Sequence, residues 1–303
     1  MRLKLLNDYL RETFGCKVYK IALNAGFTCP NRDGTLGTDG CIFCSAGGSG
    51  EFAEDATLSI TEQIEAGKAR VAKKIKDGKY IAYFQAYTNT YAPIERLRSL
   101  YLEAAGHPDI VALSIATRPD CLSEEVLDLL GEMKKIKPVW IELGLQTMHP
   151  KTAAYIRRGY DLPIYDRAVR ELRSRGIEVI THVILGLPGE TIPEMLETVR
   201  YVCDSGATGI KLQLLHVLKE TDMEKEYLEG RVQVLSEDEY LDILEQCLRV
   251  IPEQVVIHRL TGDGDKRLLV APLWSGDKKH VWNRIQKIME QIRSKCEEEE
   301  AIE

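Results

Sequence analysis

The sequence has no apolar run long enough to cross a membrane, and its amino terminus lacks the apolar core of a secretory signal. A membrane-spanning helix needs about 20 consecutive apolar residues, and polar or charged residues interrupt every apolar run of this chain before that length. Residues 1–15 read MRLKLLNDYLRETFG, in which charges separate short apolar groups. We therefore expect a protein of the cytoplasm with no membrane partner. In that compartment we expect the eight cysteines to be reduced thiols or metal ligands and not a disulfide framework.

The chain also lacks the features that mark a domain boundary or an excess of positive charge. No low-complexity linker, short repeat or break in composition divides its 303 residues, so we expect a single domain over residues 1–303. The net charge of −7 argues against a molecule that binds polyanions over its whole surface. Local basic clusters remain, each more simply explained as a solvated helix face, at 73–76, 157–158, 170–175 and 278–280.

Apolar runs alternate with amphipathic segments along the chain. The runs predict six strands, at residues 18–23, 80–84, 110–115, 139–145, 177–185 and 209–215. Helices are predicted between them, several begun by a capping sequence such as Ser59-x-x-Glu62 or Thr191-x-x-Glu194. This alternation predicts an α/β fold with a parallel sheet covered on both faces, either an open barrel or a doubly wound sheet. A further apolar run at 255–260 is a seventh strand or an edge.

Three cysteines lie in one glycine-rich loop after the first predicted strand. Cys29 is followed, after eleven residues, by Cys41 and Cys44, and Phe43 stands just before the last of them. Clustered thiolates are ligands for zinc or for an iron–sulfur cluster. A cubane cluster on three thiolates leaves one iron open to another ligand. A structural zinc site needs a fourth protein ligand, for which Cys16 or a histidine is the candidate.

A loop that ends in Cys-x-aromatic-Cys after a first strand resembles the signature of the radical S-adenosylmethionine (radical SAM) enzymes. The wide spacing between Cys29 and Cys41 resembles the bacterial branch related to the catalytic subunit of Elongator. The resemblance covers about residues 18–260, with 261–303 as an extension, and implies a partial (β/α)6 TIM-like barrel with short extensions at both ends. It also implies one [4Fe–4S] cluster on Cys29, Cys41 and Cys44, with Phe43 beside the cofactor. In that superfamily the open iron binds the amino and carboxylate groups of S-adenosylmethionine, whose reductive cleavage gives a hydrogen-abstracting 5′-deoxyadenosyl radical.

The resemblance also assigns cofactor contacts to the ends of the second and third strands, where parallel α/β folds bind ligands. The family's Gly-Gly-Glu-like triplet is absent after the second strand, so Gln85, Thr88 and Asn89 are candidates by position only, and ordinary turn chemistry explains them as well. The element Thr-Arg-Pro-Asp at 117–120 resembles one in the Elongator-like enzymes and makes Arg118 a candidate ligand for a carboxylate or phosphate. Alternatively, Arg118 pairs with Asp120 across the proline turn.

The fourth strand carries an element at 142–147 that resembles the family's Glu-x-Gly-x-Gln-Ser. Glu142 and Gln146 are therefore candidates for the ribose or the methionine part of the cofactor. A carboxylate inside an apolar strand is costly to bury unless it is satisfied, so a structural role for Glu142 is the alternative. Arg158, in the segment that follows, is a candidate for the cofactor carboxylate.

The ends of the fifth and sixth strands resemble the adenine-binding elements of the family. The run 182–190 resembles Gly-x-Ile-x-Gly-x-x-Glu with a histidine in place of the first glycine, which makes Ile184 and Gly186 candidate adenine contacts. Gln213 and Leu214 are expected to flank the adenine. His216 is assigned to catalysis on the substrate side, although an isolated histidine is more often structural.

The resemblance implies a substrate as well. Elongator-like enzymes act on the wobble uridine of tRNA, and the bacterial branch is linked to converting carboxymethylaminomethyl-uridine to aminomethyl-uridine. An external electron donor such as flavodoxin or ferredoxin is implied. A tRNA stem-loop needs only a local basic rim, for which Lys278, Lys279 and Arg284 are candidates. The alternatives are a radical SAM enzyme for a small metabolite or peptide, and a non-catalytic zinc or iron–sulfur module.

Two further features stay open at this point. The other cysteines are scattered, so we expect buried or adventitious thiols and no auxiliary cluster. The glycine-rich segment 259–265 is either a lid or substrate loop, or a plain turn.

Overall fold

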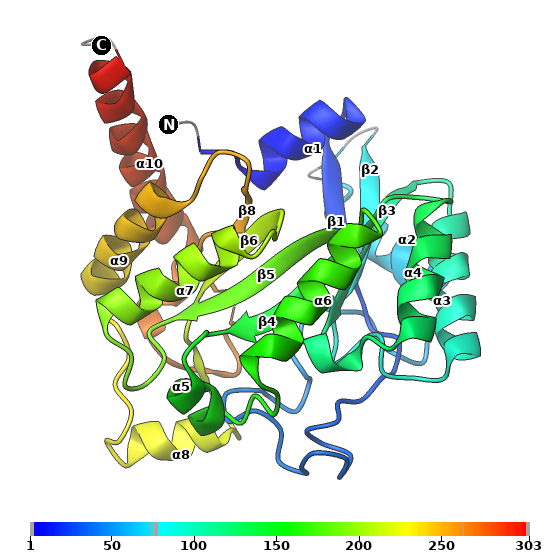
Figure 1. The fold of residues 1–303 in the computed structure, drawn as a ribbon, viewed down its shortest axis with the longest axis horizontal. Coiled ribbons are helices and arrows are strands. Elements are labelled where there is room, and N and C mark those ends of the chain that lie inside the picture. The colour runs from blue at the N-terminus through cyan, green and yellow to red at the C-terminus, as the bar shows by residue number, and fades with distance from the viewer. Residues whose placement is uncertain (1–2, 74, 76–77, 263, 301–303) are drawn as a thin grey trace.

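Seven parallel strands form one curved sheet in chain order (Figure 1). The structure, a computed structural model, describes residues 3–73, 75, 78–262 and 264–300, with side chains up to residue 294. The strands are β1 (Val18–Leu23), β2 (Lys79–Phe84), β3 (Ile110–Thr117), β4 (Val139–Gln146), β5 (Glu178–Leu185), β6 (Gly209–Leu214) and β8 (Val256–Arg259). The predicted α/β partial barrel is confirmed, and the apolar run at 255–260 supplies a seventh strand.

Helices connect successive strands and cover the outer face of the sheet (Figure 1). They are α2 (Ile60–Val71), α3 (Ile94–Gly106), α4 (Glu124–Lys134), α5 (Pro150–Tyr155), α6 (Leu162–Ser174), α7 (Ile192–Asp204) and α9 (Glu237–Val250), with the short 3-10 helix η1 (Pro119–Cys121) after β3. The capping boxes predicted at Ser59 and Thr191 both form. Each cap satisfies N–H groups that the first helical turn leaves free, which is why these helices begin where the sequence indicates.

An amino-terminal helix, α1 (Leu6–Phe14), closes the end of the sheet opposite the cysteine loop (Figure 1). Leu10 is buried in an apolar cluster with Trp140 and neighbouring strand residues. The Tyr9 ring centre lies 5.9 Å from that of Trp140, and its hydroxyl donates to Glu178 at 2.6 Å. Just before the helix, Leu5 forms a parallel bridge with Ile257 of β8. We did not predict this helix; its apolar spacing and the terminal Gly15 are the signals that could have found it.

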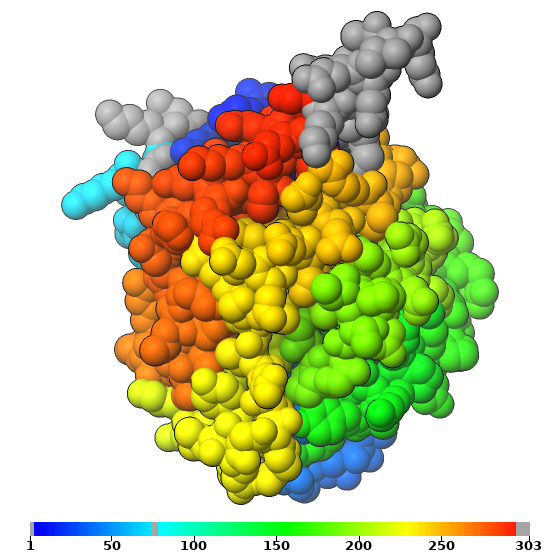
Figure 2. All heavy atoms as spheres, turned by 90° about the vertical axis from the view of Figure 1, so that its left-hand side faces the viewer, coloured from blue at the N-terminus to red at the C-terminus, as the bar shows by residue number. Residues whose placement is uncertain are grey.

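The carboxyl-terminal part of the chain covers the side of the half-barrel beyond β6. A two-stranded antiparallel sheet joins β7 (Val217–Leu218) to β9 (Leu269–Ala271), and the Trp274 indole donates to the Leu235 carbonyl at 3.0 Å. Figure 2 shows these segments, in yellow and in orange to red, next to one another on one face. The remaining elements here are α8 (Asp222–Leu228), η2 (Leu273–Gly276) and α10 (Lys278–Glu300). Among the described residues, no helix combines the length and apolar character that crossing a membrane requires.

Candidate active site

A cavity lies at the carboxyl ends of the strands, where a parallel sheet of this type binds ligands. Its wall combines the cysteine loop, the ends of β2 to β6, and Arg259 of β8. Most of the predicted site residues line it: Cys29, Cys41, Phe43, Cys44, Gln85, Thr88, Arg118, Glu142, Gln146, Arg158, Ile184, Gln213, Leu214 and His216. Asn89 and Gly186 are not brought to this wall.

Arg32 folds the long cysteine loop back so that its two ends meet. The Arg32 guanidinium donates to the carbonyl oxygens of Cys44 and of the next residue, at 2.8 and 2.6 Å. Its backbone N–H donates to the carbonyl oxygen of Cys29 at 2.8 Å, so one residue ties both ends of the motif. The Asn31 amide anchors the same loop to the segment after α5 by donating to the Arg157 carbonyl at 2.7 Å. These bonds explain how a wide cysteine spacing still delivers three thiols to one cavity.

The three thiols are close enough to influence one another. Burial, with the charges of Cys44 and Cys29, raises the pKa of Cys41 to about 12 against the opposing charge of Arg118. Burial likewise raises the pKa of Cys44, and Arg32 opposes that rise. Buried thiols of this kind become thiolates when a metal takes the place of the proton. The two arginines supply positive charge that suits a site carrying several thiolates.

This donor set fits an iron–sulfur cluster better than a zinc ion. Within the described ranges, no three Cys, His, Asp or Glu side chains come together closely enough to hold a single metal ion. A zinc ion draws four ligands to one centre, whereas a cubane cluster takes each thiolate on a different iron and so spreads them apart. Cys16, the candidate fourth zinc ligand, packs with the Leu10 and Trp140 cluster at the other end of the sheet. The zinc alternative through Cys16 is therefore wrong.

Arg118 and Arg158 both line the cavity, but protein groups occupy many of their donors. Arg118 makes two hydrogen bonds to Asp120, at 2.9 and 2.7 Å, which is the alternative pairing across the proline turn. Arg158 donates to the carbonyl oxygens of Thr147 at 2.6 Å and Tyr160 at 2.9 Å, and it lies over the Tyr160 ring. These contacts brace the segment after β4. A contact of either arginine with the cofactor stays a prediction.

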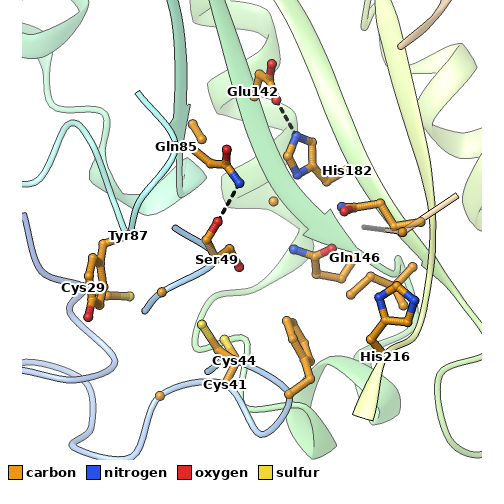
Figure 3. A pocket seen from close by; sticks show the side chains of 18 of the residues that line it. Cys29, Cys41, Cys44, Ser49, Gln85, Tyr87, Glu142, Gln146, His182 and His216 are labelled. Carbon is orange, nitrogen blue, oxygen red and sulfur yellow. Dashed lines mark hydrogen bonds and ion pairs between the residues drawn. The ribbon is translucent and has the colours of Figure 1, made fainter. Parts of the chain in front are cut away.

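Glu142 is fully buried at the floor of the cavity and accepts hydrogen bonds from four groups. One oxygen accepts from Lys20 at 2.6 Å and from Ser114 at 2.7 Å. The other accepts from His182 Nε2 at 2.7 Å and from the Lys211 ammonium (Figure 3 draws the His182 bond). Burial acts to raise the pKa of Glu142, but Lys20 and Lys211 hold it well below its usual range. These contacts match the structural alternative, and a cofactor contact of Glu142 stays a prediction.

The charges around Glu142 also shift its neighbours. Burial lowers the pKa of Lys211 to about 7; Glu142 opposes that shift, while Lys20 and Arg259 add to it. Burial likewise lowers the pKa of His182 to about 4, with Lys211 adding to the effect. His182 is therefore a neutral imidazole that donates its Nε2 proton to the carboxylate. Glu142 and the side chains around it at the floor of the cavity thus form a hydrogen-bonded network with fixed donors.

Gln146 ends β4 in a conformation that a non-glycine residue rarely adopts, with φ of 69°. Its side-chain oxygen is buried and, within the described chain, has no hydrogen-bond partner. A left-handed backbone costs on the order of 1–3 kcal/mol, and an unpaired buried amide oxygen costs about as much. Figure 3 shows Gln146 in the cavity, between the cysteines and His216. Both unfavourable features occur at a position that lines the cavity, which supports Gln146 as a binding residue.

The remaining predicted residues divide between the cavity wall and its support. The Gln85 amide donates to the Ser49 carbonyl at 2.6 Å, and His216 Nε2 lies 3.1 Å from the Ser275 hydroxyl. The Asn89 amide donates to the carbonyl oxygens of residues 84 and 116, and so links the end of β2 to β3. Gly186 has φ of 86°, and a Cβ there would meet the side chain of residue 235 at 2.9 Å. The positions of Asn89 and Gly186 are therefore explained by the turns they form.

The predicted basic rim is only partly present. The Lys278 ammonium lies 5.4 Å from the ring centre of Phe52, which lines the cavity, so Lys278 stands at the mouth. Arg284 instead forms ion pairs with Glu237 at 3.1 Å and Asp238 at 2.7 Å, and its charge is largely balanced. The predicted basic cluster at 73–76 and the segment 259–265 include residues outside the described ranges, namely Lys74, Lys76 and Asp263.

Sequence reasoning missed the cations below the cavity, Lys20, Lys211 and Arg259. They belong to no motif that we recognised. A signal was nevertheless available, because each lies within an apolar strand run, where a buried charge requires a partner. The rule that selected Glu142 would have selected its partners Lys20 and Lys211.

Comparison with protein families gives two matches. Residues 27–202 match the sequence model of the Radical SAM superfamily, and residues 207–291 match that of the Radical_SAM C-terminal domain. The first match ends within the last turn of α7 and the second begins just before β6, although β5 and β6 pair directly across this division. The sheet is therefore continuous through both matched regions.

Individual proteins resemble this chain to different extents. It is 48% identical to YtqA, an uncharacterized protein of Bacillus subtilis, over 95% of this chain and 90% of that protein. It is 25% identical to the tRNA uridine(34) acetyltransferase of Methanocaldococcus jannaschii, over 61% of this chain and 34% of that protein. Among solved structures, Elp3 of Methanocaldococcus infernus superposes with a TM-score of 0.64 at 18% identity, over 84% of this chain and 58% of that one. That last likeness is one of fold.

Proposed function

The chain belongs to the radical SAM superfamily, an enzyme family that uses a [4Fe–4S] cluster and S-adenosylmethionine, and from this premise we propose that it modifies the wobble uridine of tRNA. When bound, the cluster and S-adenosylmethionine supply a 5′-deoxyadenosyl radical that abstracts a hydrogen atom from the substrate. The observation that carries the class is the convergence of three thiols on the cavity at the strand ends.

In this proposal the chain's own residues hold the cluster, orient the cofactor and shield the reacting carbon from water. Cys29, Cys41 and Cys44 hold the cluster, and Arg32 keeps the loop closed through its bonds to Cys44 and Cys29. The unpaired Gln146 oxygen accepts a hydrogen bond from the cofactor. The wall formed by Phe43, Ile184, Gln213 and Leu214 encloses the adenosine and keeps water from the reacting carbon.

The substrate proposal rests on relatives. The similarity to a tRNA uridine(34) acetyltransferase extends over 61% of this chain and points to the wobble position. The proposed reaction converts carboxymethylaminomethyl-uridine to aminomethyl-uridine and begins with hydrogen abstraction from the carbon between the amine and the carboxylate. Loss of one further electron from the substrate gives an imine, and water splits the imine into the aminomethyl product and glyoxylate. S-adenosylmethionine is the net oxidant and ends as methionine and 5′-deoxyadenosine. An extruded base can enter the cavity past Lys278 at its mouth. A cytoplasmic setting with flavodoxin or ferredoxin as electron donor completes the proposal.

Mass spectrometry of tRNA nucleosides tests the proposal directly. Cluster-loaded protein is incubated without oxygen with S-adenosylmethionine, a reductant and tRNA carrying carboxymethylaminomethyl-uridine. We expect that nucleoside to be replaced by aminomethyl-uridine, with release of 5′-deoxyadenosine. Release of 5′-deoxyadenosine with unchanged tRNA would instead favour a small metabolite or a peptide as substrate.

Replacement of the cysteines tests the cluster assignment. Cys29→Ala, Cys41→Ala and Cys44→Ala should each abolish reductive cleavage of S-adenosylmethionine, because each removes one of the three thiolates. Cys203→Ala, a cysteine of α7 away from the cavity, is the control and should retain cleavage. Iron and acid-labile sulfide, measured on each variant, separate loss of the cluster from loss of chemistry. Full cleavage by the triple variant would end the assignment.

A further inference from the structure

The floor of the cavity holds more basic than acidic side chains. Lys20 and Lys211 form ion pairs with the carboxylate of Glu142, and Arg259 is the register partner of Lys211 in the sheet. Two other acidic residues line the wall: Asp265, which is paired with Arg267 outside it, and Glu51, which accepts a hydrogen bond from Ser45 and acts on the Cys44 thiol. Uncompensated positive charge in a poorly solvated site is unfavourable unless an anion joins it. The cavity floor is therefore matched to a negatively charged group that the described residues do not provide.

Arg259 is the cation best placed to receive such a group. It is the register partner of Lys211 across β6 and β8, so the two side chains rise from neighbouring strands into the same wall. Arg259 is half-buried, and within the described part of the chain no hydrogen bond or ion pair involves its side chain. Its planar guanidinium can give two parallel hydrogen bonds to a carboxylate, and the ammonium of Lys211 can add a third.

We propose that Arg259 and Lys211 bind the carboxylate of the substrate's carboxymethylamino group and so position the carbon next to it for hydrogen abstraction. This inference rests on the proposed function and deepens it, because the aminomethyl product lacks that carboxylate and loses the contact. The site thus distinguishes substrate from product by charge.

The methionine part of S-adenosylmethionine carries a carboxylate too, but a different part of the cavity suits it. In the superfamily that carboxylate binds the open iron, and the thiols stand on the loop after β1. Arg259 lies on β8, the last strand at the opposite edge of the sheet. The arginines whose charges act on the thiols are Arg32 and Arg118, whereas Arg259 acts on Lys211, His182 and Tyr83. The two carboxylates therefore have separate cationic partners.

Arg259→Gln is the main test variant, because among the described residues Arg259 has no hydrogen-bond partner that its removal would leave unpaired. We compare cluster-loaded wild type and variant on tRNA carrying carboxymethylaminomethyl-uridine and on the same tRNA with that carboxylate methylated. The wild type should prefer the acid over the ester by about 10–100-fold in kcat/KM, the range for a charged hydrogen bond. Arg259→Gln should lose that preference, mainly through KM, and Arg259→Lys should recover part of it.

Two controls separate a local role from a general defect. Arg249→Gln changes an exposed arginine of α9 that pairs with Glu245, and it should behave as wild type. The KM for S-adenosylmethionine should be unchanged in Arg259→Gln. A raised KM for S-adenosylmethionine, with the preference for the acid intact, would assign the carboxylate to the cofactor and overturn the proposal. Equal use of acid and ester by the wild type would overturn it as well.

A ligand without RNA distinguishes failure of this site from failure of the tRNA function. N-methylglycine carries the same secondary amine and single carboxylate as the substrate side chain. It should raise the unfolding temperature of the wild-type holoenzyme and not that of Arg259→Gln. Stabilisation of the wild type alone, combined with unchanged tRNA, would support the anion site and end the tRNA function. Conversion of tRNA with equal efficiency by both proteins would support the function and end the anion site.

Discussion

His182 shows how one buried residue makes stability depend on pH. Its pKa is lowered to about 4 in the folded protein, against an ordinary value near 6.5. Between these values the unfolded chain binds a proton that the folded chain does not, so acid favours unfolding. We expect the free energy of unfolding to fall by up to about 3 kcal/mol from pH 6.5 to pH 4 through this group alone.

Urea unfolding of the cluster-free protein at several pH values measures this effect, with His182→Gln as the test. The variant cannot take up that proton, so its stability should depend less on pH over the same window. Equal pH dependence in wild type and His182→Gln would contradict a neutral buried imidazole.

The sequence brings candidate residues to the cavity wall where a motif fixes both residue type and position along the chain. The cysteines lie in the loop after β1, and Gln146 and Gln213 lie at the ends of β4 and β6, strands whose apolar runs were clear. Lys211 and Arg259 could not be paired beforehand, since their meeting depends on the register between β6 and β8. That register includes an irregularity between residues 210 and 211, which no sequence pattern reveals.

At the scale of elements, α2 approaches β1 closely at Gly67. A Cβ at this position would lie 2.4 Å from Cγ2 of Ile21 in β1. Gly67→Ala should therefore destabilise the protein by about 1–3 kcal/mol through overpacking, despite the better helix propensity of alanine. Gly131→Ala in α4, where a Cβ meets nothing within 4 Å, should instead stabilise by about 0.5–1 kcal/mol.

Thermal or urea unfolding of both glycine variants gives the comparison. Because the same substitution is made in two helices, the helix-propensity gain is common to both and the difference reports packing. If the Gly67→Ala variant were at least as stable as the Gly131→Ala variant, β1 would have moved to make room for the added methyl group. The close approach of α2 to β1 would then not be required for stability.

Elements were predictable when they were long and periodic. The six principal strands, the seventh at 256–259 and the capped helices agree with the apolar pattern and the capping residues. Strands β7 and β9 are two and three residues long, and they exist because segments far apart in the chain pair with each other. Local sequence carries no signal for such pairing.

At the scale of the molecule, an acidic protein must bind a polyanion through a small surface. The net charge is −7, while Lys278 lies near the mouth of the cavity and Lys279, the next residue, is exposed. Each phosphate contact contributes about −0.7 to −0.9 to the slope of log affinity against log salt concentration, so two or three contacts give a slope of about −2.

Fluorescence anisotropy with an anticodon stem-loop measures this dependence. The salt concentration is varied from about 50 to 200 mM, a range over which phosphate contacts change the affinity strongly. Replacing both Lys278 and Lys279 by Gln should make the slope shallower by about one to two. Lys134→Gln and Lys135→Gln, at the end of α4, form the matched control pair and should leave it unchanged. A wild-type affinity that does not depend on salt would contradict the electrostatic rim.

The bridge between Leu5 and Ile257 has a consequence for how copies of this protein behave together. A sheet that stops short of closing into a full barrel presents edge strands, and a free edge offers unpaired N–H and C=O groups to another chain. The amino-terminal segment occupies the outer edge of β8, where Ile257 donates its N–H to the carbonyl oxygen of Lys4 at 2.8 Å. Proteolysis that removed this segment would leave the edge exposed, and the trimmed protein would gain a tendency to self-associate that the intact chain avoids.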